Sequence, residues 1–344
     1  MITLHHNDND GRCAAAIVKC ELNNIWEGVP SKENFYEYNH GNKFPNITDE
    51  ELMKHRTVFI VDLAFNEELY NFTKRVVISG RKLVYIDHHK SGREYYEKLV
   101  EDGTIDPEYI KDKVTIFFRE DISATMLCWI YACMHEDERS HPMDVPFDLS
   151  SDMTQIGFYI GDIKQRVIAI PNVVRLINDT DIWANQFKES QAFASGFALE
   201  QDRGPCEKVW QELLYENGGS VIVKYINNGE IINSYQRNIN KRVLYNAFEV
   251  EIDGIKTLAL NTTYGNSLIF GEKYGEYPMV CKFSYDGSIK KWRYTFYSHE
   301  QYKDTVDCSE IAKKYFNGGG HRGAAGGTLN YNYFILDTEF QAKH

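Results

Sequence analysis

The chain has 344 residues, a formal net charge of −12 at pH 7 and 43% hydrophobic residues. This length and composition favour two domains, each large enough to bury its own core. The acidic balance argues against recognition of long polyanions, because proteins that bind them usually present a basic face.

The cysteines and the chain start point to an intracellular compartment. Seven cysteines are present, an odd number with no C-x-x-C pair, which is typical of buried thiols under reducing conditions. The first residues lack a basic segment followed by an apolar one, and no apolar run reaches the length of a membrane span. We therefore expect a soluble, cytoplasmic protein that does not enter a membrane.

The first half of the chain alternates short apolar runs with longer amphipathic ones, which predicts a mostly parallel sheet covered by helices. Strands are expected over residues 1–4, 57–61, 82–86 and 114–118. Helices are expected over 12–18, over 66–75 with Asn66 as N-cap, and over 123–133 as a buried crossover.

Three further segments complete the first half and lead into the second. Residues 136–151 are charged and contain proline, which predicts a surface loop. Residues 173–178 are apolar but too short to distinguish a strand from a helix. Helices are expected over 186–214 and over 221–246, the second interrupted at Asn227-Asn228-Gly229.

From Phe248 the apolar period changes to that of strands. These are expected over 248–252, 257–261, 280–285 and 292–298, with Asp286-Gly287 as a hairpin turn. A short helix over 307–316 follows, with Asp307 as its N-cap, and ends at a run of glycines. The predicted fold is α/β: a domain with a mostly parallel sheet (1–190), a helical linker (191–225) and a smaller α+β domain (226–344).

Acidic and imidazole side chains follow the expected strands where these end. His6, Asp8 and Asp10 follow the first strand, and in an extended segment all three would point to one side. The later members of this group are Asp62, Asp87-His88-His89, Asp179 and Asp181. Parallel strands bring their carboxyl ends to one sheet edge, so we expect these groups to converge. The alternative for the first segment is a polar turn with a helix cap.

A cluster of this composition predicts a metal centre. Unpaired carboxylates at close range repel one another and raise one another's pKa, and divalent cations remove that conflict. Mixed carboxylate and imidazole ligation without thiolate suits Mn²⁺ better than structural zinc. The ligands exceed the needs of one ion, so two divalent ions are expected.

The motifs resemble those of a known family. His6-Asn7-Asp8-Asn9-Asp10-Gly11, Val61-Asp62, Asp87-His88-His89 and Asp179-Thr180-Asp181-Ile182-Trp183 are similar to the four motifs of the DHH phosphoesterases. The glycine-rich run from Gly318 to Gly326 resembles the GGGH signature of the DHHA1 substrate domain. The five motifs stand in the family order and span nearly the whole chain.

The resemblance implies a role for each residue. One ion would be held by His6, Asp8 and Asp62, and the other by Asp10, Asp62, His88 and Asp179, with Asp62 bridging. Asp181 is the second candidate for the fourth-motif ligand. His89 would orient a ligand or contact the scissile phosphate, and Asp87 would fix a histidine tautomer. Plain structural hydrogen bonding is the alternative for Asp87 and His89.

The glycine-rich motif is expected to bind substrate. Gly318, Gly319 and Gly320 can expose consecutive backbone N–H groups to an anion, and His321 and Arg322 can add charged donors. A helix C-cap is the alternative role of the glycines, and we expect both roles to hold. The family often carries a substrate-binding arginine in the preceding strand, where this chain has Tyr297; Arg293 could face the same side and compensate.

The resemblance implies a metal-dependent phosphodiesterase in which two ions activate a water molecule. The pairing of the two domains without further modules is most similar to the nanoRNases, which act on very short RNA oligomers and linear dinucleotides. The expected partners are therefore short RNA oligonucleotides or dinucleotides, with a homodimer possible. The alternatives are a cyclic-dinucleotide phosphodiesterase, a single-strand exonuclease and, among non-enzymes, a nucleotide-binding regulator with a relict site.

Overall fold

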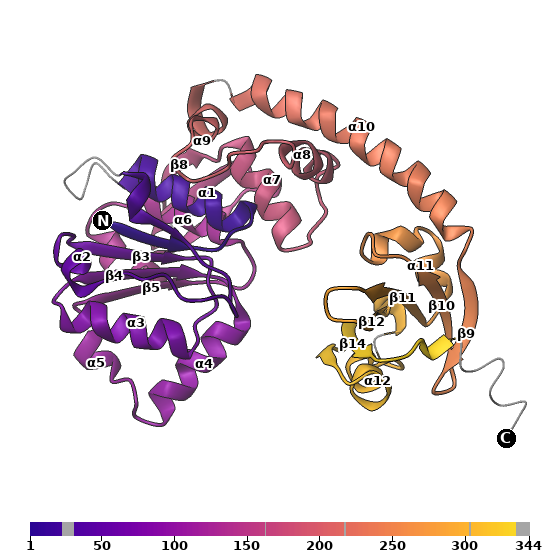
Figure 1. Cartoon of the computed structure of the whole chain (residues 1–344). Helices are drawn as coiled ribbons and strands as arrows, with labels where there is room; N and C mark the ends of the chain where they lie inside the picture. The colour runs from indigo at the N-terminus through magenta and orange to yellow at the C-terminus, as the bar shows by residue number, and fades with distance from the viewer. Residues whose placement is uncertain (23–30, 162, 217, 303, 335–344) are drawn as a thin grey trace, which may run out of the picture. The chain divides into compact units, whose positions relative to one another are not determined.

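A five-stranded parallel sheet with the order β2-β1-β3-β4-β5 forms the centre of the first half of the structure (Figure 1). The structure is a computed structural model that describes residues 1–22, 31–161, 163–216, 218–302 and 304–334. All four expected strands are present, and β2 adds an edge strand that was not predicted. The bounds are β1 (Ile2–His5), β2 (Phe35–Glu37), β3 (Thr57–Val61), β4 (Lys82–Asp87) and β5 (Val114–Phe118).

Helices cover both faces of this sheet, because successive residues of a buried strand point to opposite sides. Phe59 and Val61 of β3 belong to the core formed with α1 (Asn9–Ile17) and α6 (Ala124–Cys133). Val58 and Ile60 belong to the core on the other side, with α3 (Glu67–Ile78) and α4 (Lys90–Glu101). The short helices α2 (Asp49–Met53) and α5 (Pro107–Ile110) complete this second layer.

A small antiparallel sheet follows, and it corrects one prediction. Its strands are β6 (Phe147–Leu149), β7 (Gln155–Ile160) and β8 (Ile163–Ala169), in the order β6-β7-β8. Residues 136–151, expected as a loop, therefore contain a strand, because Phe147 and Leu149 alternate with Asp148 and pack against the main core. The next segment is a helix, α7 (Asn172–Asp181), whose apolar residues are buried.

The two helices that directly follow α7 pack in the same unit as the parallel sheet. The chain divides into two compact units, Met1–Ile232 and Asn233–His344. Residues 191–225 were expected to form a helical linker. They contain α9 (Lys208–Gln211) and all of α8 (Ser190–Phe197) except its first residue. Phe193 and Phe197 of α8 and Trp210 of α9 are almost completely buried in the main core, so this segment contributes to the first unit.

The helix α10 (Gly218–Leu244) runs without a break through Asn227-Asn228-Gly229, where an interruption was expected. The reason for the glycine is packing. A Cβ atom on Gly229 would lie 1.6 Å from the Ala192 carbonyl oxygen, and one on Gly196 would lie 1.8 Å from that of Tyr225. The backbones of α8 and α10 therefore touch at these two glycines, and a side chain at either position would separate them.

The second unit contains a six-stranded mixed sheet with the order β13-β14-β12-β11-β10-β9. Neighbouring strands are antiparallel except β10 and β11. Helix α12 (Cys308–Tyr315) packs on it through Ile311 and Ala312, which confirms the α/β class with a smaller α+β second unit. The bounds are β9 (Phe248–Ile252), β10 (Ile255–Asn261), β11 (Met279–Asp286), β12 (Lys291–Tyr297), β13 (Gly319–His321) and β14 (Ala324–Leu329).

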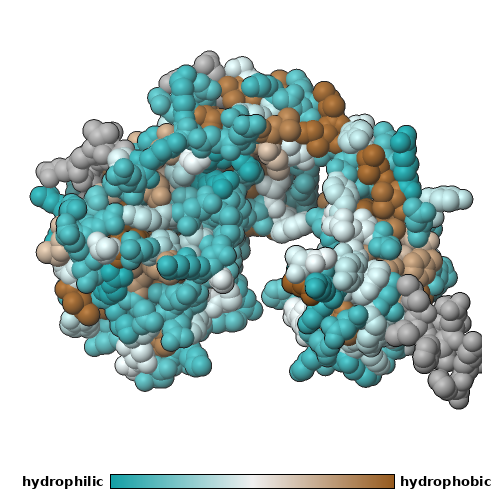
Figure 2. Space-filling view, in the orientation of Figure 1, coloured by the Kyte–Doolittle hydropathy of each residue, from teal (hydrophilic) through white to brown (hydrophobic). Residues whose placement is uncertain are grey.

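The surface of the first unit is mostly hydrophilic on the side that Figure 2 shows, as the net charge suggests. Hydrophobic side chains gather along α10, where Val223 and Ile231 are exposed. Within the described residues, no helix combines the length and the apolar character that a transmembrane segment requires.

We expect Gly229→Ala to destabilise the protein by roughly 1–3 kcal/mol, because the added methyl group forces α8 and α10 apart. Gly219→Ala, in the same helix but with no atom within 4 Å of the new Cβ, is the matched control. This control should gain up to about 1 kcal/mol from helix propensity. Urea unfolding followed by circular dichroism measures both, and equal stability of the two variants would contradict the close packing.

Candidate metal centre

The segment after β1 forms a tight turn that leads directly into α1. His6 leaves the strand, Asp8 is the N-cap of α1, and Asp10 lies in the first helical turn. The extended alternation expected for these residues is therefore wrong, although the turn still brings them together. Asp8 Oδ1 accepts a hydrogen bond from the Gly11 N–H at 2.9 Å. A Cβ on Gly11 would lie 2.6 Å from the His6 carbonyl oxygen, so only glycine permits this turn.

Asp10 is held by the start of a distant helix. Its buried carboxylate accepts hydrogen bonds from the backbone N–H groups of Ala124 and Thr125, each at 2.8 Å. These are among the free donors of the first turn of α6, where the helix dipole also favours negative charge. No local pattern in the sequence indicates this contact, because α6 is separated from Asp10 by 114 residues.

Asp62 follows β3 and lies close to several of the other acidic and imidazole side chains. Its backbone takes a left-handed conformation, with φ of 58°, and its side chain is almost completely buried. A non-glycine residue in this conformation is uncommon and concentrates at functional sites. Asp62 Oδ1 lies 3.3 Å from His88 Nε2, and Asp62 Oδ2 lies 3.7 Å from His6 Nδ1.

Asp87 and His89 form a hydrogen-bonded pair beside the cluster. His89 Nδ1 donates to Asp87 Oδ1 at 2.7 Å, and the Tyr85 hydroxyl lies 2.8 Å from Asp87 Oδ2. Burial lowers the pKa of His89, but the hydrogen bond and the charge of Asp87 prevail and raise it. The buried carboxylate of Asp87 thus orients the His89 ring through Nδ1. Tyr85 is a supporting residue that the sequence analysis missed, although it stands two positions before Asp87 on the same strand face.

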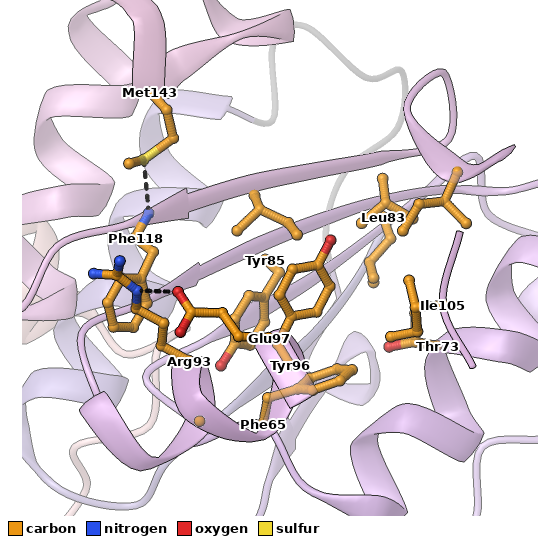
Figure 3. A pocket seen from close by; sticks show the side chains of 14 residues that line it. Phe65, Thr73, Leu83, Tyr85, Arg93, Tyr96, Glu97, Ile105, Phe118 and Met143 are labelled. Carbon is orange, nitrogen blue, oxygen red and sulfur yellow. Dashed lines mark hydrogen bonds and ion pairs between the residues drawn. The ribbon is translucent and has the colours of Figure 1, made fainter. Parts of the chain in front are cut away.

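Tyr85 also lines a cavity of about 240 Å³ between the sheet and helices α3, α4 and α5 (Figure 3). Phe65, Leu83, Tyr96 and Ile105 form much of its apolar wall, and the ion pair between Arg93 and Glu97 lies at one side. None of the expected metal ligands lines this cavity. It is a hydrophobic hollow behind the site and not the place where the acidic groups meet.

The acidic and imidazole groups meet in three overlapping sets. Each set offers ligand atoms that lie within 4.8 Å of one another. Asp62 occurs in two of the sets, as does His88. The sets are His6–Asp8–Asp62, Asp62–His88–His89 and Asp10–His88–Asp181.

Two carboxylate oxygens of this cluster have no hydrogen-bond partner among the described residues. Asp62 Oδ2 and Asp181 Oδ2 are buried and accept no hydrogen bond. A buried carboxylate oxygen without a partner is costly, and a divalent cation would satisfy it. The donor set contains carboxylates and imidazoles without thiolate, so the residues fit a cation that prefers such ligands.

The pKa values of the clustered carboxyl groups show that their negative charges are not fully compensated. Burial, and then the neighbouring Asp10, raises the pKa of Asp62 well above its ordinary value. The same two causes raise the pKa of Asp181 to about 9. Asp8 differs, because hydrogen bonds from His6 and Gly11 outweigh its burial and lower its pKa to about 2. The pKa of Asp181 thus lies above neutral pH, and this carboxyl holds a proton at pH 7 unless a cation replaces it.

Of the two acids in the fourth motif, Asp181 is the one that lies in the cluster, with Asp10 and His88. Both oxygens of Asp179 accept backbone hydrogen bonds, from Gln186 at 2.7 Å and from Phe187 at 3.2 Å. Asp181 Oδ2 lies 3.3 Å from His88 Nε2. The pattern of the motif favoured Asp179, but α7 and the turn after it bring the second acid to the cluster. We therefore infer that Asp181 is the ligand and that Asp179 holds the turn.

The glycine-rich motif forms a hairpin in the second unit. Gly319 to His321 form β13, which pairs with β14. The Gly318 N–H donates to the Ala312 carbonyl at 3.1 Å and so helps to end α12, as the capping interpretation predicts. The left-handed residue of this cap is Asn317, with φ of 47°. Gly319 and Gly320 are exposed.

Both arginines considered for substrate binding have acidic partners. Arg322 Nη1 lies 3.2 Å from Asp307 Oδ2, and His321 is exposed. Arg293 and Tyr297 share one face of β12, as predicted, because they are four residues apart on a strand. Arg293, however, is ion-paired with Asp286 near the opposite end of the strand.

The comparisons with known proteins bear on the fold. No protein-family model matches the chain, and no curated protein matches it in sequence. Among solved structures, the DHH domain of a member of a ribosomal protein family is 18% identical, with a TM-score of 0.53, over 99% of this chain and 85% of that one. The chain therefore has the fold of a DHH-domain protein, which confirms the expected architecture.

Two further solved structures are similar over the same length with lower scores. A pGpG-specific phosphodiesterase from Vibrio cholerae is 13% identical, with a TM-score of 0.41, over 99% of this chain and 97% of that one. The exonuclease RecJ, bound to manganese, is 12% identical, with a TM-score of 0.43, over 99% of this chain and 87% of that one.

The inferred role of Asp181 predicts different effects of two similar substitutions. Asp181→Asn should weaken Mn²⁺ binding by roughly 10-fold or more, because it removes a charged ligand. Asp179→Asn should leave Mn²⁺ affinity within about 2-fold and change mainly stability, because its oxygens serve backbone amides. Isothermal titration with Mn²⁺ measures both affinities. The opposite order of effects would return the ligand role to Asp179.

The raised pKa of Asp181 predicts how pH changes the stability of the metal-free protein. A carboxyl whose pKa is higher in the folded state stabilises the protein while protonated, and this contribution is lost as pH rises from about 4 to about 9. The stability of the wild type relative to Asp181→Asn, which cannot ionise, should therefore fall across this window. Chemical unfolding in a chelator measures the difference, and saturating Mn²⁺ should abolish the fall. A pH-independent difference would contradict it.

Proposed function

We propose that this protein is a metal-dependent phosphodiesterase that hydrolyses short oligoribonucleotides and linear dinucleotides. The observation that carries the proposal is the buried carboxylate and imidazole cluster around Asp62, with two carboxylate oxygens that lack a hydrogen-bond partner among the described residues. Such a cluster beyond the carboxyl ends of parallel strands lies where α/β sheets bind their ligands. The fold of a DHH domain supports the same class of reaction.

Two divalent cations, with Mn²⁺ favoured by the ligand chemistry, would occupy the cluster. His6, Asp8 and Asp62 would hold one of them, and Asp10, His88 and Asp181 the other, with Asp62 shared. When bound, the ions supply an activated water molecule at neutral pH and positive charge for the phosphoryl oxygens.

The remaining residues prepare the site for a phosphodiester. The amides of Ala124 and Thr125 fix Asp10, and the cap of α1 fixes Asp8, so both ligands are oriented before substrate arrives. His89 is favoured as imidazolium because Asp87 accepts its Nδ1 proton. Its other ring nitrogen then carries a proton that can be donated to a phosphate oxygen.

The second unit would hold the rest of the substrate at the glycine hairpin. The exposed Gly319 and Gly320 allow close approach of a phosphate, and His321 and Arg322 offer donors beside it. Arg293 pairs in register with Thr328, away from the hairpin turn, whereas Arg322 lies in the turn itself, although it too has an acidic partner, Asp307. We therefore assign this contact to His321 and Arg322 and not to Arg293.

The charge of the protein favours a short substrate. Release of counterions by basic residues dominates the affinity for long strands, and a chain with a net charge of −12 provides little of it. Positive potential would be confined to the bound cations and the few donors near the hairpin. Those groups suffice for one or two phosphates, and each further nucleotide would meet an acidic surface.

The decisive experiment is turnover of labelled oligoribonucleotides of about two to twenty nucleotides in Mn²⁺ at fixed salt. We expect kcat/KM to be highest at about two to five nucleotides and to fall beyond, with loss of turnover in chelator and a loss of at least roughly 10³-fold in Asp62→Asn. Asp121→Asn, an exposed acid paired with Arg119, is the control and should keep full activity.

Other outcomes would assign a different function. Faster cleavage of the longest strand would indicate a single-strand exonuclease, and preference for a cyclic dinucleotide would indicate the corresponding phosphodiesterase. Binding of nucleotides without any turnover in Mn²⁺ would reject the enzymatic proposal in favour of a regulator.

A further inference from the structure

His40 lies at the same sheet edge as the metal cluster, although no motif contains it. Strand β2 pairs with β1 up to Glu37 and His5, and the Tyr38 N–H continues the pairing to the His5 carbonyl at 2.9 Å. His40 stands two residues further along, in the segment that leaves the sheet. His6 follows His5 on the neighbouring strand, so both imidazoles come from adjacent strand ends.

A hydrogen bond fixes His40 over this edge. Its Nδ1 atom lies 3.0 Å from Asn66 Nδ2, and Asn66 ends the connection between β3 and α3. Because β1 lies between β2 and β3 in the sheet, this contact joins the two loops that flank the end of β1. That end carries His6, one of the proposed ligands.

The same contact determines where the proton of His40 lies. Asn66 is the N-cap of α3, and its Oδ1 accepts a hydrogen bond from the Leu69 N–H at 3.0 Å. The amide orientation is thereby set, so Nδ2 is the atom that donates to His40 Nδ1. The neutral imidazole then carries its proton on Nε2.

The surroundings of His40 favour that neutral form. Burial, and then the nearby His6 and His89, lower the pKa of His40. Its ring packs edge-on against Tyr38, with centroids 5.5 Å apart, which restricts its rotation. The side chain is nevertheless exposed, and among the described residues no hydrogen-bond partner is found for Nε2.

We propose that His40 is a substrate-binding residue whose Nε2–H donates a hydrogen bond to a non-bridging oxygen of the phosphate at the metal centre. This inference rests on the proposed function and adds to it a donor that none of the five motifs contains. A neutral donor suits this place, because it binds an oxygen without competing with the cations for carboxylate ligands.

Two substitutions separate this role from support of the Asn66 cap. Glutamine can place an amide donor near the position of Nε2, whereas asparagine reaches only the position of Nδ1. We therefore expect His40→Ala to lower kcat/KM for a diribonucleotide roughly 10- to 100-fold, His40→Gln to recover much of the loss, and His40→Asn to recover little. Mn²⁺ affinity should stay unchanged in all three, since His40 is not a ligand. His55→Ala, at the other end of the sheet beside Met1, is the control.

A binding measurement makes the outcome independent of turnover. Titration of the Mn²⁺-loaded protein with inorganic phosphate should show weaker binding for His40→Ala and for His40→Asn than for wild type and His40→Gln. If the wild type cleaves no oligonucleotide but this order holds, the proposed substrate is wrong and the role of His40 stands. If the wild type is active and His40→Ala equals it in both assays, or if asparagine restores function better than glutamine, the role of His40 is refuted.

Discussion

The repulsion among buried carboxylates at one sheet edge is the constraint on which the rest of the site depends. Asp10, Asp62 and Asp181 approach one another because they lie at the ends of three different elements. Burial and the neighbouring carboxylates raise the pKa of Asp62 and that of Asp181. A fold tolerates such a conflict only when some other interaction removes it. The amides at the start of α6 do so for Asp10, and for the other two the remedy is a cation or a proton.

This constraint explains the rigid environment of the ligands. Asp62 occupies a left-handed backbone conformation, and Gly11 admits a turn that no larger residue would allow. Both features cost free energy, and the buried strands β1 and β3 supply the packing that maintains them. Behind them, the Tyr85 hydroxyl ties the site to the hydrophobic layer formed by α3 and α4. The candidate metal ligands thus lie next to the buried strands of the first unit.

Sequence reasoning located most of the residues that meet in this cluster because their signals are local. A fully apolar strand such as β3 ending in an acid is visible in the sequence, and so is the Asp87-His88-His89 run. It favoured Asp179 over Asp181, because the position of each acid depends on how α7 ends and on which amides lie nearby, and the sequence does not show this. The sequence also predicted an interruption of α10 at Gly229, because glycine weakens an isolated helix. In the structure this glycine is required, because α8 packs directly against it. The strand at 147–149 escaped notice because three residues carry too little periodicity.

The hydrogen bonds between α6 and Asp10 affect when the site can form during synthesis of the chain. Asp10 and the Ala124 amide that fixes it are 114 residues apart in the chain, so Asp10 is synthesised well before its partner. Contacts of such long sequence separation form late, since closing the intervening loop must precede them. An unfinished chain would therefore expose loose acidic groups with little ability to retain a cation. The proposed ligands therefore come together only after β1, β3, β4, α6 and α7 have been synthesised and have packed.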